Sequence, residues 1–261
     1  MQKRPSPAAY AHRALWRRVA AAASAVGCLI AVAAVPAHAE ECPSEASAFE
    51  TSSAKLGRLD RGADRVLDIL AIGSSSTEGV GASSPAHAYP AELSSELNGE
   101  DKLAAEVRNA GVGGELAAGT LQRLKAALKT GWPELVIWQV GTNDALVGVN
   151  EALFKATVES GIAAARAAGV PLLLVDPQFA AKIPDAARYE RFVAIIDSLG
   201  ARLGVPVLTR YAMMKRWGVK KALALLSGDG LHMNDLGYRC LARAIAEEIE
   251  DAAGPRAAAK L

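Results

Sequence analysis

The most apolar strand candidate in this chain reads Leu135-Val136-Ile137-Trp138-Gln139-Val140, and the polar turn Gly141-Thr142-Asn143-Asp144 follows it at once. A near-continuous apolar run bounded by turn residues is typical of a strand that is covered on both faces. Other strand-like runs alternate with stretches of helical periodicity. The predicted strands span residues 66–72, 106–110, 135–140, 171–175 and 205–209, and the predicted helices span 90–97, 116–129, 151–168, 186–203, 213–226 and 236–249.

This alternation of strands and helices predicts an α/β fold, in which a five-stranded parallel sheet carries helices on both faces. No long linker interrupts it, so one domain is expected over residues 40–251, followed by a tail at 252–261 that frays. Ligands of such sheets bind beyond the carboxyl ends of the strands. Ser75, Gly114 and Asn143 each follow a predicted strand, and we expect them at one common edge.

The first 39 residues have the character of a secretory signal. Arg13, Arg17 and Arg18 flank an uncharged, Ala-rich apolar run at 19–35, and the small-residue pattern at 37–39 predicts cleavage after Ala39. A membrane anchor is the alternative, but the run is shorter than the ~20 strongly apolar residues that a membrane span needs. We therefore expect a periplasmic or secreted protein with no stable membrane insertion after cleavage.

Cleavage would leave 222 residues and would change the net charge from +1 to −4, because the segment carries five basic residues and no acidic one. A weakly acidic surface gives no support for a nucleic-acid partner. Two cysteines, Cys42 and Cys240, would remain and could form a disulfide in an oxidising compartment or stay as separate thiols. Neither His87 nor His232 lies at ligand spacing from a cysteine, so no metal and no cofactor is expected.

Four short polar runs carry the candidate chemistry. Ser75 lies in a tight Ser-rich turn bounded by glycines, where main-chain N–H groups can face a developing negative charge. Gly114 has no side chain and can bring its N–H close to a ligand. The Asn143 amide is a neutral donor that suits a carbonyl oxygen becoming an oxyanion. Each run alone is also compatible with an ordinary turn or helix cap.

The fourth run, Asp229-Gly230-Leu231-His232, places an acid and a base three residues apart before the last predicted helix. The base of a serine hydrolase needs a second group that holds its other ring nitrogen. Only His87 and His232 follow the predicted signal, and His87 lies in a Ser/Pro/Ala loop. His232 is therefore the candidate base and Asp229 its partner.

Taken together, the four runs resemble the SGNH hydrolases, also called the GDSL esterase/lipase family, over roughly residues 67–241. Ser75 matches the family's nucleophile, Gly114 and Asn143 its glycine and asparagine, and Asp229 and His232 its final Asp-x-x-His block. The resemblance implies a flavodoxin-like three-layer sandwich. It also implies an oxyanion hole formed by Ser75, Gly114 and Asn143, and ester or thioester hydrolysis.

One block departs from the family pattern. The aspartate that usually precedes the nucleophile is Ser74 here, and the following leucine is Ser76. That aspartate is not the acid of the catalytic triad, so Asp229 still fills this role. The change could alter the geometry of the turn or the choice of substrate.

The function predicted from the sequence is an exported serine esterase that works through an acyl-enzyme. Few aromatic residues and no obvious lid insertion favour short acyl groups, such as acetyl groups on carbohydrate, and hence a small-molecule or polysaccharide ester as substrate. A lysophospholipase or thioesterase, an acyltransferase and a non-catalytic binding protein are the alternatives. The natural substrate and the oligomeric state stay open. A further segment, Asp176-Pro177-Gln178, follows the fourth predicted strand and is interpreted as a turn that could also line the pocket.

Overall fold

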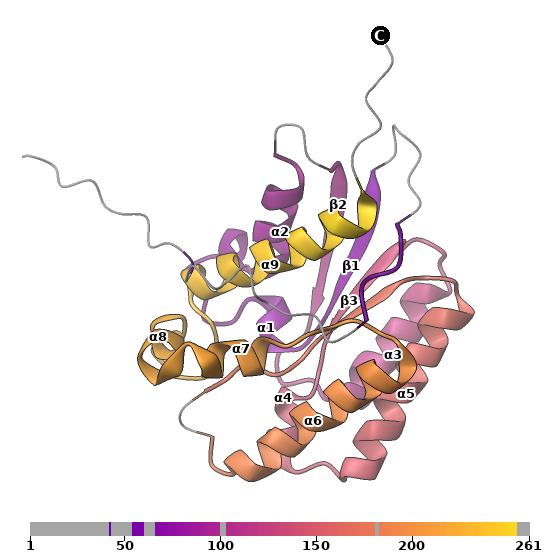
Figure 1. The fold of residues 1–261 in the computed structure, drawn as a ribbon. Coiled ribbons are helices and arrows are strands. Elements are labelled where there is room, and N and C mark those ends of the chain that lie inside the picture. Colours follow the sequence, from indigo (N-terminus) through magenta and orange to yellow (C-terminus); the bar gives the residue numbers. More distant parts are fainter. Residues whose placement is uncertain (1–41, 43–53, 60–65, 100–102, 181–182, 255–261) are drawn as a thin grey trace, which may run out of the picture. The chain divides into compact units, whose positions relative to one another are not determined.

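A computed structural model describes residue 42 and residues 54–59, 66–99, 103–180 and 183–254. The predicted signal at 1–39 and most of the predicted tail at 252–261 lie outside these residues. Figure 1 shows the arrangement of the elements. The strands are β1 (Leu67–Gly73), β2 (Ala105–Gly111), β3 (Leu135–Gln139), β4 (Leu172–Val175) and β5 (Val207–Leu208). The longer helices are α2 (Tyr89–Leu97), α3 (Ala117–Leu128), α5 (Glu151–Ala167), α6 (Ala186–Leu203) and α9 (Asp235–Ala253), and the shorter ones are α1 (Ser75–Glu78), η2 (Pro85–His87), α4 (Thr142–Val147), α7 (Arg210–Arg216) and α8 (Gly218–Ala224).

The five strands form one parallel sheet in the order β2-β1-β3-β4-β5. This is the flavodoxin-like order, and the predicted fold class is confirmed. The chain reverses its direction of travel across the sheet between β1 and β3. Ligands of open α/β sheets bind at such a switch point, beyond the carboxyl ends of the strands. Figure 1 shows α1, α4 and α7, which follow β1, β3 and β5, gathered at that edge.

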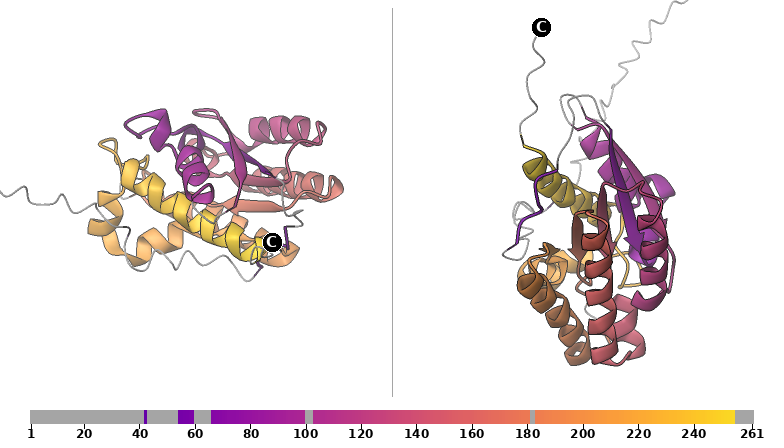
Figure 2. Two further views of the ribbon diagram at one scale, coloured as in Figure 1. Left: turned by 90° about the horizontal axis from the view of Figure 1, so that it is seen from above. Right: turned by 90° about the vertical axis from the view of Figure 1, so that its right-hand side faces the viewer.

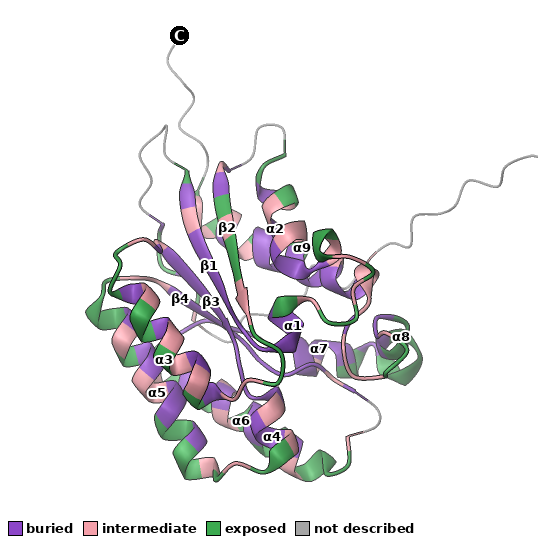
Figure 3. Ribbon diagram, turned by 180° about the vertical axis from the view of Figure 1, so that it is seen from behind, coloured by how far each residue is buried: buried purple, intermediate pink, exposed green. Residues whose placement is uncertain are grey.

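Two hydrophobic cores lie on opposite faces of the sheet, because successive side chains of a strand point to opposite faces. Ile69 and Ile137 pack with α2 and α9 on one face, whereas Leu70 and Trp138 pack with α3, α5 and α6 on the other. The views in Figure 2 show the sheet between these two helical layers. In Figure 3, β1, β3 and β4 are buried along most of their lengths, whereas the edge strand β2 is partly exposed.

Three of the longer helices, α5, α6 and α9, begin after a residue whose side chain caps the helix. The side chains of Asn150, Asp185 and Asn234 accept hydrogen bonds from main-chain N–H groups at the starts of α5, α6 and α9. Such caps satisfy N–H groups that have no partner within the helix. Close packing also depends on Gly161 in α5, where an added Cβ would lie 2.1 Å from the ring of Trp138.

Three differences from the predicted elements have local causes. The helix predicted at 213–226 is divided into α7 and α8 at Gly218, whose φ of 79° interrupts the helical backbone. The fifth strand is only two residues long, because Pro206 has no N–H and Thr209 is already the N-cap of α7. The last helix continues through Ala253, so the first residues of the predicted tail are helical.

A disulfide joins Cys42 to Cys240 in α9, with the two Cα atoms 5.5 Å apart. Of the two states that the sequence allowed for these cysteines, the structure shows the disulfide. The bond closes a loop of 198 residues, and it ties the segment that precedes the sheet to the helix that completes one layer. Cross-links that close long loops restrict the unfolded chain most strongly in the chain-entropy account of disulfides.

We expect the Cys42→Ser variant to lose about 2–5 kcal/mol of unfolding free energy, because the unfolded chain regains the freedom of the long loop. Urea denaturation of the parent protein with and without a thiol reductant measures the same loss independently. Cys42→Ser in the presence of reductant is the matched control and should show no further change. A parent midpoint that does not respond to reductant would contradict the prediction.

Candidate active site

The register of the sheet brings the predicted runs to one edge. Gly73, the last residue of β1, pairs with Gly111, the last residue of β2. Ile72 pairs with Trp138, so the residues that follow β1 and β3 leave the sheet side by side. Ser75 thus begins α1 directly beyond β1, and Asn143 lies in the first turn of α4 beyond β3.

Ser75, His232 and Asp229 form a continuous hydrogen-bonded chain. The Nε2 atom of His232 lies 2.8 Å from the Ser75 Oγ, and its Nδ1 lies 2.5 Å from the Asp229 Oδ2. Ser75 is buried, and the His232 side chain is 16% exposed. The structure therefore joins three residues that the sequence places in two distant runs. A serine, an imidazole and a carboxylate in this order can activate the hydroxyl as a nucleophile.

The second oxygen of Asp229 organises the loop that carries His232. Its Oδ1 accepts hydrogen bonds from the main-chain N–H groups of Leu231 and His232 and from the Ser227 hydroxyl, at 2.8, 2.9 and 2.9 Å. Partial burial alone would raise the pKa of Asp229, but the hydrogen bonds from His232, Leu231 and Ser227 outweigh it and hold the pKa well below its usual range. The carboxylate stays ionised at any pH near neutrality.

The segment between α1 and η2 supports the back of the same loop. Gly81 has a φ of 94°, and a Cβ there would lie 2.5 Å from the Met233 carbonyl oxygen and 2.9 Å from the His232 Cβ. The Asp235 carboxylate accepts from the N–H and hydroxyl of Ser83 at 2.7 and 2.6 Å. Tyr238 donates its hydroxyl to the Val80 carbonyl at 2.6 Å. The start of α9 thus holds this segment against His232.

Asn143 contacts the residue that follows Gly114. The Asn143 Nδ2 donates to the Glu115 carbonyl oxygen at 2.9 Å, which leaves its second hydrogen for another acceptor. Gly114 has a φ of 75°, and a Cβ there would meet nothing within 4 Å. The neighbouring Gly113 faces the Glu78 carboxylate of α1, since a Cβ on Gly113 would lie 2.7 Å from it. This contact brings the loop between β2 and α3, which we call the glycine loop, to the helix that begins with Ser75.

An ion pair fixes the glycine loop to the sheet. Arg123 pairs with Glu115, with 3.0 Å between Nε and Oε1. The same guanidinium donates to the carbonyl oxygens of Ala110 and Gly73, at 2.7 and 3.2 Å, near the ends of β2 and β1. Burial raises the pKa of Glu115, and the hydrogen bonds from Arg123 and Thr120 more than reverse this, so that the pKa lies below its usual value.

Most of this chain matches one known protein family. The model of the non-GDSL lipase-like family matches residues 41–255. The protein belongs to this family, within the SGNH hydrolases. The family resemblance stated from the four runs is thereby confirmed. The predicted enzyme class, a serine ester hydrolase, agrees with this family.

Individual relatives agree with this assignment. The chain is 30% identical over 127 residues to esterase TesA of Pseudomonas aeruginosa, a match that covers 48% of this chain and 60% of that protein. A lipase/acylhydrolase from Enterococcus faecalis is similar in structure with a TM-score of 0.64 and 25% identity, over 74% of this chain and 100% of that one. The SGNH-hydrolase family esterase AlinE4 has a TM-score of 0.53 and 26% identity, over 75% and 100% of the two chains.

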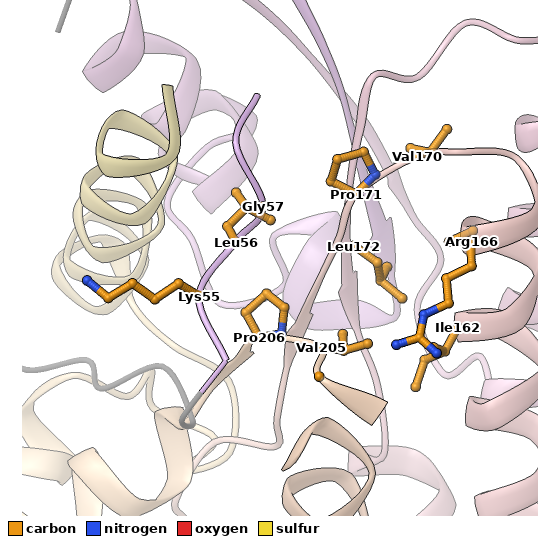
Figure 4. A pocket seen from close by; sticks show the side chains of 12 residues that line it. Lys55, Leu56, Gly57, Ile162, Arg166, Val170, Pro171, Leu172, Val205 and Pro206 are labelled. Atoms are coloured by element: carbon orange, nitrogen blue, oxygen red, sulfur yellow. The ribbon is translucent and has the colours of Figure 1, made fainter. Parts of the chain in front are cut away.

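Other regions of this SGNH hydrolase do not share the chemistry of the site. A pocket of about 260 Å³ lies at the amino ends of β4 and β5, which is the end of the sheet opposite to Ser75. In Figure 4, Pro171 and Leu172 lie between Leu56 and Arg166. The described residues contain no group of three or more His, Cys, Asp or Glu side chains placed to hold a metal ion. Among the helices of the same residues, none is both long enough and apolar enough to cross a membrane. The Nδ1 of His87 lies 2.8 Å from a carboxylate oxygen of Glu92 in α2.

At the position where the family usually has an aspartate, Ser74 of this chain donates two hydrogen bonds to Gln139. The N–H and the hydroxyl of Ser74 both donate to the Gln139 Oε1, at 3.0 and 3.1 Å, and the Thr77 hydroxyl lies 3.4 Å from the same oxygen. All three residues are buried. The sequence did not predict this role of Gln139. The available signal was a single amide within the otherwise apolar strand β3, one residue before the turn that carries Asn143.

We expect that restoring an aspartate, Ser74→Asp, destabilises the protein by about 1–3 kcal/mol, because a carboxylate would face the Gln139 Oε1 instead of donating to it. A buried carboxyl has a raised pKa in the folded state, so this loss of stability grows as the pH rises above its unfolded value near 4. Urea denaturation at pH 5 and pH 8 measures both effects.

Ser74→Ala is the matched control for this substitution. It removes only the hydroxyl, retains the main-chain donor, and should cost about 1 kcal/mol with no such pH dependence. A Ser74→Asp variant as stable as the parent at pH 8 would show that the bond to Gln139 does not set the conformation of the turn.

Proposed function

We propose that this protein hydrolyses carboxylic esters, with Ser75 as the nucleophile and an acyl-enzyme as the intermediate. The observation that carries the proposal is the unbroken chain from Ser75 Oγ through both ring nitrogens of His232 to the Asp229 carboxylate. Membership in the SGNH hydrolases supports it.

In the first step, His232 Nε2 takes the proton of Ser75 as the hydroxyl oxygen attacks the ester carbonyl. The ionised Asp229 keeps the Nδ1 of the ring protonated, so that Nε2 is free to accept. The imidazolium then protonates the leaving alcohol, and the alcohol departs. In the second step, His232 activates a water that attacks the acyl group on Ser75, and the free acid leaves.

The negative charge on the tetrahedral oxygen needs donors that are already in place. We assign these to the N–H groups of Ser75 and Gly114 and to the second amide hydrogen of Asn143. The bond from Asn143 to the Glu115 carbonyl supports this role, because it fixes the amide next to Gly114 before the substrate arrives. Donors fixed in this way need no reorganisation during the reaction.

The proposed substrates are short-acyl esters, with acetyl groups on carbohydrate as one class. Aromatic residues make up only 5% of the chain, which leaves little material for a large acyl-binding lining. The segment between α1 and η2 is held by Asp235 and Tyr238 and so is poorly suited to act as a movable cover. We also propose that the protein is exported. The disulfide between Cys42 and Cys240 supports export, because disulfides persist in oxidising compartments.

The catalytic assignment predicts the response of three variants to a fluorophosphonate probe and an aryl acetate. Ser75→Ala should take up no label and show no turnover above background. Asn143→Ala should remain folded, and its kcat should be about 10²–10³-fold below that of the parent, because one oxyanion donor is lost. Asn150→Ala removes an asparagine that only caps α5 and should retain the parent kcat.

Two results would count against the assignment. Labelling of the Ser75→Ala variant would place the nucleophile elsewhere. An Asn143→Ala variant as active as Asn150→Ala would remove Asn143 from the oxyanion hole while leaving the nucleophile in place.

The preference for short acyl groups is tested separately with aryl esters of increasing acyl length. We expect kcat/KM to be highest for acetyl to butyryl esters and to fall for longer chains, since the chain has few aromatic side chains with which to bury a long acyl group. Ser75→Ala measured on each ester corrects for spontaneous hydrolysis. A maximum at long acyl chains would overturn the short-acyl proposal and would favour a lysophospholipase or a thioesterase.

A further inference from the structure

Gln178 contacts two segments of the active site, and it takes no part in the proposed reaction steps. It follows β4 at the carboxyl edge of the sheet and is fully buried. The structure thus differs from the expectation that the segment 176–178 could line the pocket, because neither Asp176 nor Gln178 is exposed. A buried side-chain amide costs free energy unless its polar atoms are satisfied, so its partners carry information.

The amide of Gln178 connects two of the four runs. Its Nε2 donates to the Leu231 carbonyl oxygen at 2.9 Å, within the loop between Asp229 and His232. Its Oε1 accepts from the Thr142 hydroxyl at 3.2 Å, and Thr142 is the residue before Asn143. The side that carries the base and the side that carries the oxyanion donor therefore meet at one side chain.

Arg210 fixes which way this amide points. Its guanidinium is fully buried, and the Nη2 donates to the Gln178 Oε1 at 2.9 Å. Because arginine has donors only, the oxygen of the amide must face Arg210, and the nitrogen must then face Leu231. Arg210 is itself held by the Asp176 carbonyl oxygen, which accepts from its Nε and Nη2 at 3.1 and 2.8 Å. A donation by Tyr189 to the main-chain carbonyl of Gln178, at 2.9 Å, completes the anchorage.

The loop that receives this bond contains little regular structure. It lies between α8 and α9, and a single bridge between Leu226 and Met233 joins its two ends. Within the loop, Asp229 accepts the side-chain hydrogen bonds, and main-chain bonds run from Ser227 N–H to the His232 carbonyl at 2.7 Å and from Gly230 N–H to the Ser227 carbonyl at 3.0 Å. Gly81 limits the position of the loop from one side. The bond from Gln178 ties the loop to the central sheet, which also carries Ser75.

We propose that Gln178, oriented by Arg210, is a positioning residue that holds the loop 229–232 so that the Nε2 of His232 faces Ser75. This inference rests on the proposed function of the site. Small displacements of reacting groups have large effects on rate, and a shift of 1 Å can cost about 10²-fold. Gln178 acts through His232 and does not touch the substrate.

Two substitutions separate positioning from stability. Gln178→Glu retains an oxygen acceptor for Arg210 but places a second oxygen against the Leu231 carbonyl, which repels it. Gln178→Met removes the partners of both Arg210 and Leu231. We expect kcat for an aryl acetate to fall about 10–100-fold in both variants, with KM changed little, because the alignment of His232 is lost. The rate of Ser75 labelling by a fluorophosphonate should fall by the same factor. The melting temperature should fall clearly only in Gln178→Met.

Thr157→Val is the matched control, because it removes a part-buried hydrogen bond within α5, from the Thr157 hydroxyl to the Leu153 carbonyl. It should retain the parent kcat and labelling rate even where its melting temperature falls. A folded Gln178→Glu variant with the parent kcat would overturn the inference. If neither Gln178 variant folds, the residue is structural and the positioning role is likewise overturned. If the proposed function itself is wrong, the parent protein will show no labelling that depends on Ser75. This result differs from a failure of the Gln178 inference, in which the parent is labelled and the Gln178→Glu variant is labelled at the same rate.

Discussion

The hydrogen bond between His232 Nε2 and Ser75 Oγ is the interaction on which the geometry of this site depends. It joins residues 157 positions apart, one directly beyond the first strand and the other just before the last helix. Nothing local to either residue creates the contact. Its length is set by where β1 ends and by how the loop before α9 is held, so the sheet and the final helix must be in place before the pair exists. The disulfide between α9 and Cys42 strengthens the element on which that loop depends.

The side-chain amides of Gln139 and Gln178 hold the two segments that carry Ser75 and His232. Gln139 lies under the turn that presents Ser75, and Gln178 lies under the loop that presents His232. Both are almost fully buried at the carboxyl edge of the sheet, where Gln139 ends β3 and Gln178 follows the end of β4. The Gln178 amide accepts and donates at once and so joins two elements, whereas the Gln139 amide only accepts, because its buried Nε2 has no hydrogen-bond partner among the described residues. Neither amide places a second carboxylate next to Asp229. The resulting site has one ionised acid next to the base and hydrogen-bonded amides beneath it.

The replacement of the family aspartate by Ser74 is understandable in these terms. The serine is small, donates twice to Gln139, and adds no charge to a buried turn. The substitution therefore changes how the nucleophile turn is held and leaves the chain from Ser75 to Asp229 intact. Membership in the non-GDSL lipase-like family agrees with a first block that lacks the usual residues around the serine.

Much of the fold could be predicted from the sequence, because parallel strands covered on both faces are apolar along their length and the longer helices show their periodicity. The short helices α1 and α4 contain too few turns to show a period, and the boundary at Gly218 depends on its positive φ, so neither was predicted. The residue types of Ser75, Gly114, Asn143, Asp229 and His232, and their places after strands or before a helix, were determined by the sequence alone. Only the tertiary structure decided their distances, the partners of Gln139 and Gln178, and the closure of the disulfide. These depend on contacts between segments that are far apart in the chain, and a linear pattern can suggest such contacts but does not fix their geometry.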